Sequence, residues 1–374
     1  MEVTLDVSAV PARPAGAGRY IIDLAREVGN RLRADLGLVC TTGDAARWQA
    51  IAPAARTYPV LPARRAARLA AEQVVPLIRP HRPRGTLWHG PHYSLPLAYR
   101  RGPRVVTIHD LSFLSHPEWH EPAKVAYFKR MIPAAARRAD HVLCVSERTR
   151  TELLSLIPLD PERVSVTPLG LDERLLDAAP ATPAGIADGR PYVLALGTAE
   201  PRKNLVRLIA AFDRIAPEFP DLVLALAGQT GWRNGPIAEA IARSDHRHRI
   251  VELGYVPDED LPALLAGAQA LCYPSLYEGF GLPVLEALAS GAVVVTSAGT
   301  VMQDNAAEAA MYVDPLDEGS IAEGLRTALN LDAGPRSARI EAGRARARAF
   351  TWTRTADLTI EGYEQATAHW ARRG

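Results

Sequence analysis

Two glutamates, Glu278 and Glu286, lie eight residues apart within the stretch YEGFGLPVLEALASG, residues 277–291. The apolar run before this stretch predicts a buried strand, and its second half predicts a helix that ends at the final glycine. Ionised carboxylates are pure hydrogen-bond acceptors, so this pair would suit a ligand that presents several hydroxyls. Gly279 and Gly281 would let the backbone approach that ligand closely. Either glutamate alone would be ordinary, because acidic residues near a helix start also stabilise the helix dipole.

An adjacent pair of cations, Arg202 and Lys203, follows another strand-like apolar run in GTAEPRKNL. The pair stands just before a predicted helix, where backbone N–H groups and fixed positive charge together favour a diphosphate. An isolated basic pair is more often a solvated surface feature. However, ligands of α/β proteins bind at the carboxyl ends of the strands, where this pair is predicted to lie. The cations and the two carboxylates together therefore predict a nucleotide-sugar pocket.

The first half of the chain offers a glycine-containing turn and one histidine. Gly16 and Gly18, in PAGAGRY, separate the first predicted strand from the first helix, but the third glycine of a dinucleotide-binding fingerprint is missing. A plain tight turn is an equally good interpretation. His109 ends the predicted strand RVVTIH, where its ring could hydrogen-bond to a ligand or exchange a proton with it. The alternative is a structural histidine bonded to the backbone.

Three further histidine pairs, in HGPH, HPEWH and HRH, raise the question of a metal site. None lies on a clear helix that would bring ligands four residues apart together, and no cysteine accompanies them. The acidic triplet DED, residues 258–260, is interpreted as a helix start near Glu259, with Asp258 as the capping residue. The sequence therefore predicts loop and surface histidines and no metal.

Apolar runs of strand length alternate with helical patterns along the whole chain. Runs buried on both faces and joined by helices predict parallel sheets with helices on each side, and a linker rich in Pro, Ala and Gly divides them into two arrays. The fold class is therefore α/β, with two Rossmann-like, doubly wound domains and a ligand cleft between them. The N-terminal domain is expected at 1–171, the linker at 172–191 and the C-terminal domain at 192–351. Residues 335–372 are predicted to be helical throughout, with the part 352–374 crossing back to complete the N-terminal domain.

The composition limits the functions to consider. The 374 residues carry a net charge of +1, which gives no electrostatic case for a nucleic-acid partner. Three cysteines lie far apart in apolar runs, which suggests buried thiols in a reducing cytoplasm. No apolar run approaches the ~18 residues of a spanning helix, so the protein is expected to be cytoplasmic, or at most peripheral at the inner face of a membrane. Residues 62–80, with Arg64, Arg65 and Arg68, could contact an anionic membrane, although an ordinary surface helix is favoured.

The stretch EGFGLPVLE resembles the E-x7-E signature of the retaining GT-B glycosyltransferases of family four. GAGRYI, RVVTIHDLSF, GTAEPRKNL and GYVPDEDLPALLAGA are similar to other blocks of that family, in the same order and over nearly the whole chain. The resemblance implies the GT-B fold, with a donor nucleotide held mainly by the C-terminal domain and an acceptor by the N-terminal domain. It is closest to a mannosyltransferase-like subgroup.

The resemblance also implies a role for each residue singled out above. Glu286 would bind the ribose hydroxyls, and Glu278 would lie near the transferred sugar or its phosphate. Arg202 and Lys203 would neutralise the diphosphate leaving group, while His109 would lie near the sugar. The implied catalytic residues are His109, Glu278, Arg202 and Lys203, and the implied donor-binding residues are Gly16, Gly18, Arg202, Lys203, Tyr255, Val256, Glu278, Gly279, Phe280, Gly281, Leu282 and Glu286.

One departure from the family concerns the cation pair. Many members carry an arginine directly after the glycine at this strand end, whereas here Gly197 is followed by Thr198. Arg202 is therefore expected to take over part of that role.

These features predict a retaining hexosyltransferase that moves a sugar, with mannose from GDP-mannose favoured, from a nucleoside diphosphate to a saccharide or lipid-linked acceptor hydroxyl. The resemblance implies front-face displacement, in which the leaving phosphate takes the acceptor proton, and it implies no metal or other cofactor. Two alternatives stay open. One is a nucleotide-sugar epimerase or phosphorylase on the same fold, and the other is a non-catalytic sugar-nucleotide-binding subunit. The donor base, the sugar, the acceptor, the linkage and the oligomeric state stay open as well.

Overall fold

The computed structural model describes residues 1–12, 14, 16–64, 67–68, 71–73, 85–181, 186 and 189–373, and it has an α/β architecture. The chain divides into two compact units. Unit 1 comprises Met1–Pro117, Pro122–Gly170 and Thr351–Gly374, and unit 2 comprises Glu118–Glu121 and Leu171–Phe350.

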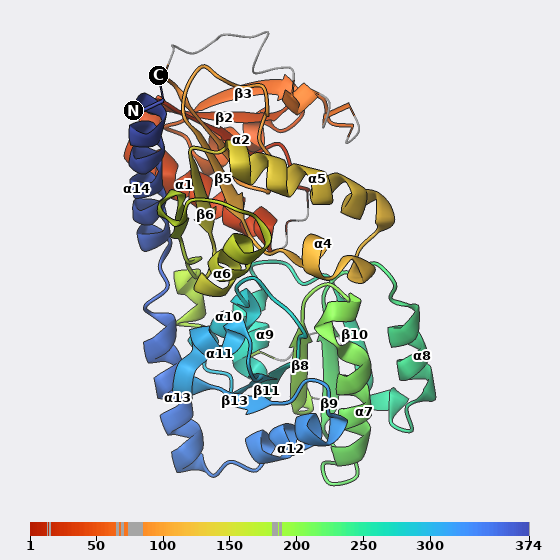
Figure 1. Ribbon diagram of the computed structural model, residues 1–374. Helices are drawn as coiled ribbons and strands as arrows, with labels where there is room; N and C mark the ends of the chain where they lie inside the picture. Colours follow the sequence, from red (N-terminus) through yellow and green to blue (C-terminus); the bar gives the residue numbers. More distant parts are fainter. Residues whose placement is uncertain are drawn as a thin grey trace. The chain divides into compact units, whose positions relative to one another are not determined.

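Unit 1 is built on a parallel sheet that has seven strands among the described residues, in the order β3-β2-β1-β4-β5-β6-β7. Figure 1 labels β2, β3, β5 and β6 of this sheet. The strands are β1 (Val3–Asp6), β2 (Leu36–Thr41), β3 (Arg56–Leu61), β4 (Leu87–Gly90), β5 (Arg104–Ile108), β6 (His141–Cys144) and β7 (Val164–Val166). Every residue of β2, β4 and β6 is buried, because helices cover both faces of the sheet. The helices are α1 (Ala17–Leu32), α2 (Ala45–Ile51), α4 (Ser112–Ser115), α5 (Pro122–Arg138), α6 (Glu147–Leu156) and α14 (Trp352–Ala371).

Helix α14, at the C-terminal end of the chain, packs against α1 and β6 of unit 1 (Figure 1). It starts after Thr351, whose side chain accepts a hydrogen bond from the backbone N–H of Arg354 at 3.2 Å. Gly362 allows close contact with β6, since a Cβ there would lie 2.7 Å from the Leu143 side chain. The prediction of one continuous helix over 335–372 is wrong, because the chain leaves α13 at Ala347 and the N-cap of α14 interrupts it.

Unit 2 repeats the architecture with a parallel sheet of six strands among the described residues, in the order β10-β9-β8-β11-β12-β13. The strands are β8 (Tyr192–Leu196), β9 (Val223–Ala227), β10 (Ile250–Gly254), β11 (Ala270–Tyr273), β12 (Val294–Ser297) and β13 (Met311–Val313). The helices are α7 (Leu205–Ile215), α8 (Gly235–Arg243), α9 (Leu261–Gly267), α10 (Leu282–Ser290), α11 (Val301–Ala306), α12 (Glu318–Leu329) and α13 (Ala333–Ala347). The predicted pair of doubly wound α/β domains is confirmed.

Two smaller predictions have different outcomes in unit 2. Helix α10 ends at Gly291, which adopts the left-handed conformation with φ 82°, as predicted. Helix α9 begins at Leu261 and not near Glu259, and Asp260 occupies its N-cap position without a side-chain capping bond. The prediction that Asp258 caps this helix is therefore wrong.

The predicted surface helix at 62–80 falls partly on residues 65–66, 69–70 and 74–80, which lie outside the described residues, and Arg65 is one of these. The described Arg68 faces into unit 1, where it donates to the Ser8 carbonyl at 2.9 Å and lies 3.5 Å from the Glu72 carboxylate. Its side chain is only 17% exposed, so it does not present its charge to a membrane surface. Within the described parts of the chain, no helix is both long and apolar enough to cross a bilayer.

Candidate functional site

The cation pair stands on a short turn between β8 and α7. Strand β8 ends at Leu196, and Arg202 and Lys203 belong to a 3-10 turn, Pro201–Lys203, that leads into α7. Asn204 closes this turn in the left-handed conformation and donates from its amide to the carbonyls of Pro274, at 3.0 Å, and Pro315, at 2.6 Å. These bonds fix the turn against the segments that follow β11 and β13.

The two glutamates stand on either side of the start of α10. Glu278 lies on the loop after β11, and Glu286 lies inside the helix with only 6% of its surface exposed. Gly281, at the N-cap, has φ 80°, and a Cβ there would lie 2.7 Å from the Met302 side chain. A glycine is therefore required at the point where the strand-to-helix loop turns into α10.

The Glu278 carboxylate accepts bonds from four protein groups. Its Oε2 lies 2.7 Å from Arg202 Nη1. Its Oε1 lies 2.6 Å from Lys203 Nζ, 2.7 Å from Ser275 Oγ and 2.9 Å from the Tyr273 hydroxyl. Each carboxylate oxygen has two lone pairs, so the three donors at Oε1 occupy that oxygen fully, whereas Arg202 occupies one of the two sites of Oε2. In this geometry Glu278 holds the two cations. Its predicted use as an acceptor for ligand hydroxyls stays a prediction.

Burial and charge shift the pKa values of this cluster strongly. Burial alone would raise the pKa of Glu278, but Arg202, Lys203 and the bonds from Lys203 and Ser275 outweigh it and lower the pKa to about 2. Burial and the neighbouring Arg202 lower the pKa of Lys203 to about 8, although Glu278 opposes them. Burial and Glu278 raise the pKa of Tyr273 well above its usual value, so the phenol is neutral. Arg202 is also paired with a second carboxylate, since its Nε lies 3.3 Å from Glu200 Oε2. Two cations therefore face two carboxylates, Glu278 and Glu200, and the charges of the group balance.

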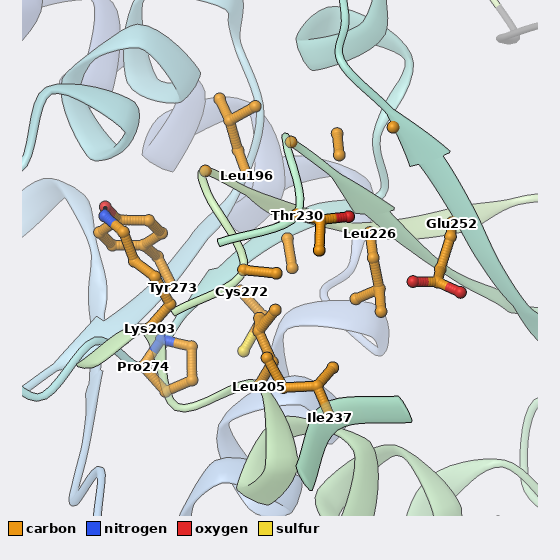
Figure 2. A pocket seen from close by; sticks show the side chains of 16 residues that line it. Leu196, Lys203, Leu205, Leu226, Thr230, Ile237, Glu252, Cys272, Tyr273 and Pro274 are labelled. Carbon is orange, nitrogen blue, oxygen red and sulfur yellow. Dashed lines mark hydrogen bonds between the residues drawn. The ribbon is translucent and has the colours of Figure 1, made fainter. Parts of the chain in front are cut away.

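A pocket of about 250 Å³ lies beside this cluster, at the carboxyl ends of β8, β9, β10 and β11. Figure 2 shows Lys203 and Tyr273 on one side of the pocket and Glu252 on the opposite side, with Leu226 and Thr230 between them. The ends of β8 and β9 lie close together at Gly197 and Gly228. A Cβ on Gly228, where φ is 148°, would lie only 2.0 Å from the Gly197 carbonyl oxygen. The cluster therefore borders a pocket that has polar side chains at two opposite sides, Lys203 and Tyr273 at one and Glu252 at the other.

The other donor-site residues predicted in this half also belong to unit 2. Tyr255 and Val256 are half-buried just after β10, and Gly279 precedes Phe280 on the loop that carries Glu278. The Phe280 ring is buried against Phe350, with ring centroids 5.8 Å apart, so the ring itself is part of the core. Leu282 is the first residue of α10.

Three predicted residues, Gly16, Gly18 and His109, belong to unit 1 and not to the cluster in unit 2. Gly16 is the N-cap of α1, with φ 46°, and Gly18 packs against Pro14. His109 lies at the end of β5, is 8% exposed, and places Nε2 2.8 Å from the Pro91 carbonyl oxygen. Burial lowers its pKa despite that bond, so the ring is neutral and Nε2–H donates to the carbonyl. His109 therefore has the backbone hydrogen bond expected of a structural histidine, and it also has the strand-end position expected of a histidine that contacts a ligand.

The other histidines that the structure describes form no metal cluster. His89, predicted to be in a loop or on the surface, is instead buried in β4, with its ring nitrogens 2.8 Å from the hydroxyls of Tyr363 and Thr107. Among the described residues, no group of three or more His, Cys, Asp or Glu side chains could hold a metal ion.

The sequence interpretation missed Tyr273 and Ser275, which both contact Glu278. A possible signal was the presence of two hydroxyl side chains at a predicted strand end, directly before the motif. Their role depends on the rotation of a buried phenol and a serine toward Glu278, which residue spacing does not report.

Comparisons with known proteins agree on one family. Residues 14–175 match the family described as Glycosyltransferase Family 4, and residues 182–346 match Glycosyl transferases group 1. O-antigen chain mannosyltransferase B of Escherichia coli is 33% identical over 287 residues, which cover 74% of each chain. An MMP alpha-(1->4)-mannosyltransferase of Mycolicibacterium hassiacum is 30% identical over 282 residues, which cover 71% of this chain and 66% of the relative.

Solved structures show the same fold at low sequence identity. The Anabaena protein HepE, in complex with UDP-glucose, superposes with a TM-score of 0.76 at 18% identity and covers 97% of this chain and 99% of its own. WaaG, a glycosyltransferase involved in lipopolysaccharide biosynthesis, superposes with a TM-score of 0.73 at 17% identity and covers 96% and 98%. The chain therefore belongs to the family 4 glycosyltransferases and has their two-domain GT-B fold.

Proposed function

We propose that this glycosyltransferase moves mannose from GDP-mannose to a hydroxyl of a saccharide or lipid-linked acceptor, with retention at the anomeric carbon. The observation that carries the proposal is the positive charge of Arg202, which is half-buried, and of Lys203, which is buried, beside a pocket at the strand ends. That charge suits a diphosphate leaving group. The choice of mannose is supported by two relatives whose names describe mannosyltransferases.

In the proposed reaction the bond between the sugar C1 and the diphosphate oxygen breaks, and a bond from the acceptor oxygen to C1 forms on the same face. The acceptor proton passes to the departing phosphate oxygen. Negative charge on the diphosphate grows as the bond breaks, and the Lys203 ammonium and Arg202 guanidinium stabilise it. Since these side chains supply fixed positive charge, the proposal includes no metal and no other cofactor.

Glu286 is proposed to accept hydrogen bonds from the ribose hydroxyls. The loop of Gly279, Phe280, Gly281 and Leu282, with Tyr255 and Val256, is proposed to contact the donor mainly through its backbone. Glu278 is assigned here to holding the cations, because four protein donors already surround its carboxylate. In unit 1, Gly16 and Gly18 are proposed to approach the donor phosphate and the acceptor, and His109 the transferred sugar.

A cytoplasmic location, and membrane contact where the acceptor is lipid-linked, are part of this proposal and follow from the choice of donor and acceptor. Neither enters the tests of the site, which use soluble ligands alone.

The test is a donor panel with the purified full-length chain. GDP-mannose, UDP-glucose, ADP-glucose and dTDP-glucose are each incubated with short mannosides, with and without EDTA, and product is detected by mass spectrometry. We expect mannosylated product from GDP-mannose, unaffected by EDTA, and an α-anomeric signal in the product by NMR. Turnover of a sugar nucleotide without acceptor, or dependence on free phosphate, would favour an epimerase or a phosphorylase. A folded protein whose melting temperature rises with one of GDP, UDP, ADP and dTDP, but which forms no product with any donor, would favour a non-catalytic sugar-nucleotide-binding subunit.

A further inference from the structure

Lys203 has few hydrogen-bond donors left for a ligand. Its ammonium has three protons, and its surface is only 8% exposed. One proton is directed to Glu278 Oε1 at 2.6 Å, and a second to the Tyr273 hydroxyl. The ammonium also lies 4.7 Å from the centre of the Tyr273 ring, within the range of a cation–π contact. These contacts leave one N–H of the ammonium to meet a phosphate oxygen.

Tyr273 connects Lys203 to Glu278 through a single hydroxyl. The phenol has one proton, which it donates to Glu278 Oε1 at 2.9 Å, so its oxygen lone pairs remain for the ammonium. The high pKa of this buried phenol keeps that proton in place. The backbone of Tyr273 is fixed as well, since its carbonyl accepts a bond from Thr296 Oγ1 at 2.8 Å within the sheet. The Tyr273 hydroxyl therefore donates one hydrogen bond to Glu278 and accepts one from Lys203. It cannot turn away from Lys203 without losing both.

We propose that Tyr273 is a positioning residue that fixes the direction of the Lys203 ammonium, so that its remaining N–H points at the diphosphate. This inference rests on the proposed function. The charge on the phosphate next to the sugar grows as the sugar leaves, so a well-directed ammonium binds the transition state and the product diphosphate better than it binds the intact donor. Loss of the hydroxyl should therefore reduce kcat and product affinity more than it reduces donor affinity.

The test compares Tyr273→Phe with a matched control, Tyr192→Phe. Tyr192 is also a buried tyrosine of unit 2, but its hydroxyl donates only to the Leu264 carbonyl, at 2.6 Å. Each substitution removes one buried hydroxyl and keeps the ring. Both variants are made in the full chain and assayed for kcat, for KM of GDP-mannose, and for Kd of GDP and inorganic pyrophosphate by calorimetry, with thermal unfolding as the check of folding.

For Tyr273→Phe we expect kcat to fall about tenfold and the Kd of GDP and pyrophosphate to rise about tenfold, since hydrogen bonds to charged groups are worth roughly that factor or more. We expect the KM of the donor to change by less than about threefold, because the phosphate carries less charge before the bond breaks. Tyr192→Phe should keep the wild-type kcat and Kd values at a comparable loss of melting temperature. This pattern would support a positioning role.

If the wild-type enzyme is active, either of two outcomes would overturn this inference and leave the proposed function intact. One is a Tyr273→Phe enzyme with wild-type kcat and wild-type GDP affinity. The other is an equal loss of kcat in both variants, which would mean that any missing buried hydroxyl disturbs unit 2. A wild-type protein that binds neither GDP nor pyrophosphate would instead overturn the proposed function, and the positioning role with it.

Discussion

Replacing Glu278 by glutamine should destabilise unit 2 at neutral pH, because it removes the carboxylate that pairs with both Arg202 and the buried Lys203. The pKa of Glu278 is lowered from 4.5 to about 2, which corresponds to about 3 kcal/mol at about 1.4 kcal/mol per pKa unit. The folded-state pKa is depressed, so this stabilisation is present above about pH 4.5 and is lost as the pH falls toward 2. At pH 3.5 the same linkage relation leaves about 2 kcal/mol.

Urea unfolding of the wild type and of Glu278→Gln at pH 7 and pH 3.5 measures this difference. A fluorescence or hydrogen-exchange probe within unit 2 is needed, since a chain of two units need not unfold in one step. Glu218→Gln is the control. Glu218 pairs with Arg326 at 2.7 Å, but that pair is exposed and should contribute little.

The reasoning would be refuted by equal stability of Glu278→Gln and wild type at pH 7, or by a difference that stays constant between pH 7 and pH 3.5. The first result would mean that the cations do not depend on Glu278. The second would mean that the effect comes from packing and not from its charge.

Three further changes test other parts of the site. Because burial and Arg202 lower the pKa of Lys203 to about 8 in the free enzyme, the ammonium loses its proton as the pH rises through that value, so kcat/KM should fall there in a pH–rate profile. A kcat/KM that stays flat to pH 10 would exclude Lys203 as the required cation. Gly228→Ala places a Cβ 2.0 Å from the Gly197 carbonyl oxygen, at a φ of 148°, and should lower the free energy of unfolding by more than about 2 kcal/mol. The melting temperature should fall accordingly. An unchanged melting temperature would contradict the close approach of the strand ends. Glu286→Ala should keep the fold but abolish the thermal shift given by GDP, and an unchanged shift would remove Glu286 from the site.

The fold followed from the sequence to a large extent, for a physical reason. A strand buried on both faces must be apolar at every position, so runs such as YVLAL and VLALA, separated by helical patterns, indicate a parallel sheet covered by helices. The helix end at Gly291 was equally local, because a glycine readily adopts the left-handed conformation that terminates a helix. The break between α13 and α14 was not visible, since residues 348–351 have no strong breaker and their turn accompanies the return of the chain to unit 1.

The sequence by itself determined which residues could bind a nucleotide sugar: a basic pair at one strand end and two carboxylates near another. Only the tertiary structure decided what Glu278 does. Strands β8 and β11 are neighbours in the sheet, and this brings Lys203 within 2.6 Å of a carboxylate 75 residues away in the chain. Residue spacing can predict that an acceptor lies on a loop. It does not predict how many donors from distant parts of the chain will contact that acceptor in the folded protein. Here Tyr273, Ser275, Arg202 and Lys203 meet one carboxylate, and that convergence makes Glu278 the counter-charge of the cation pair.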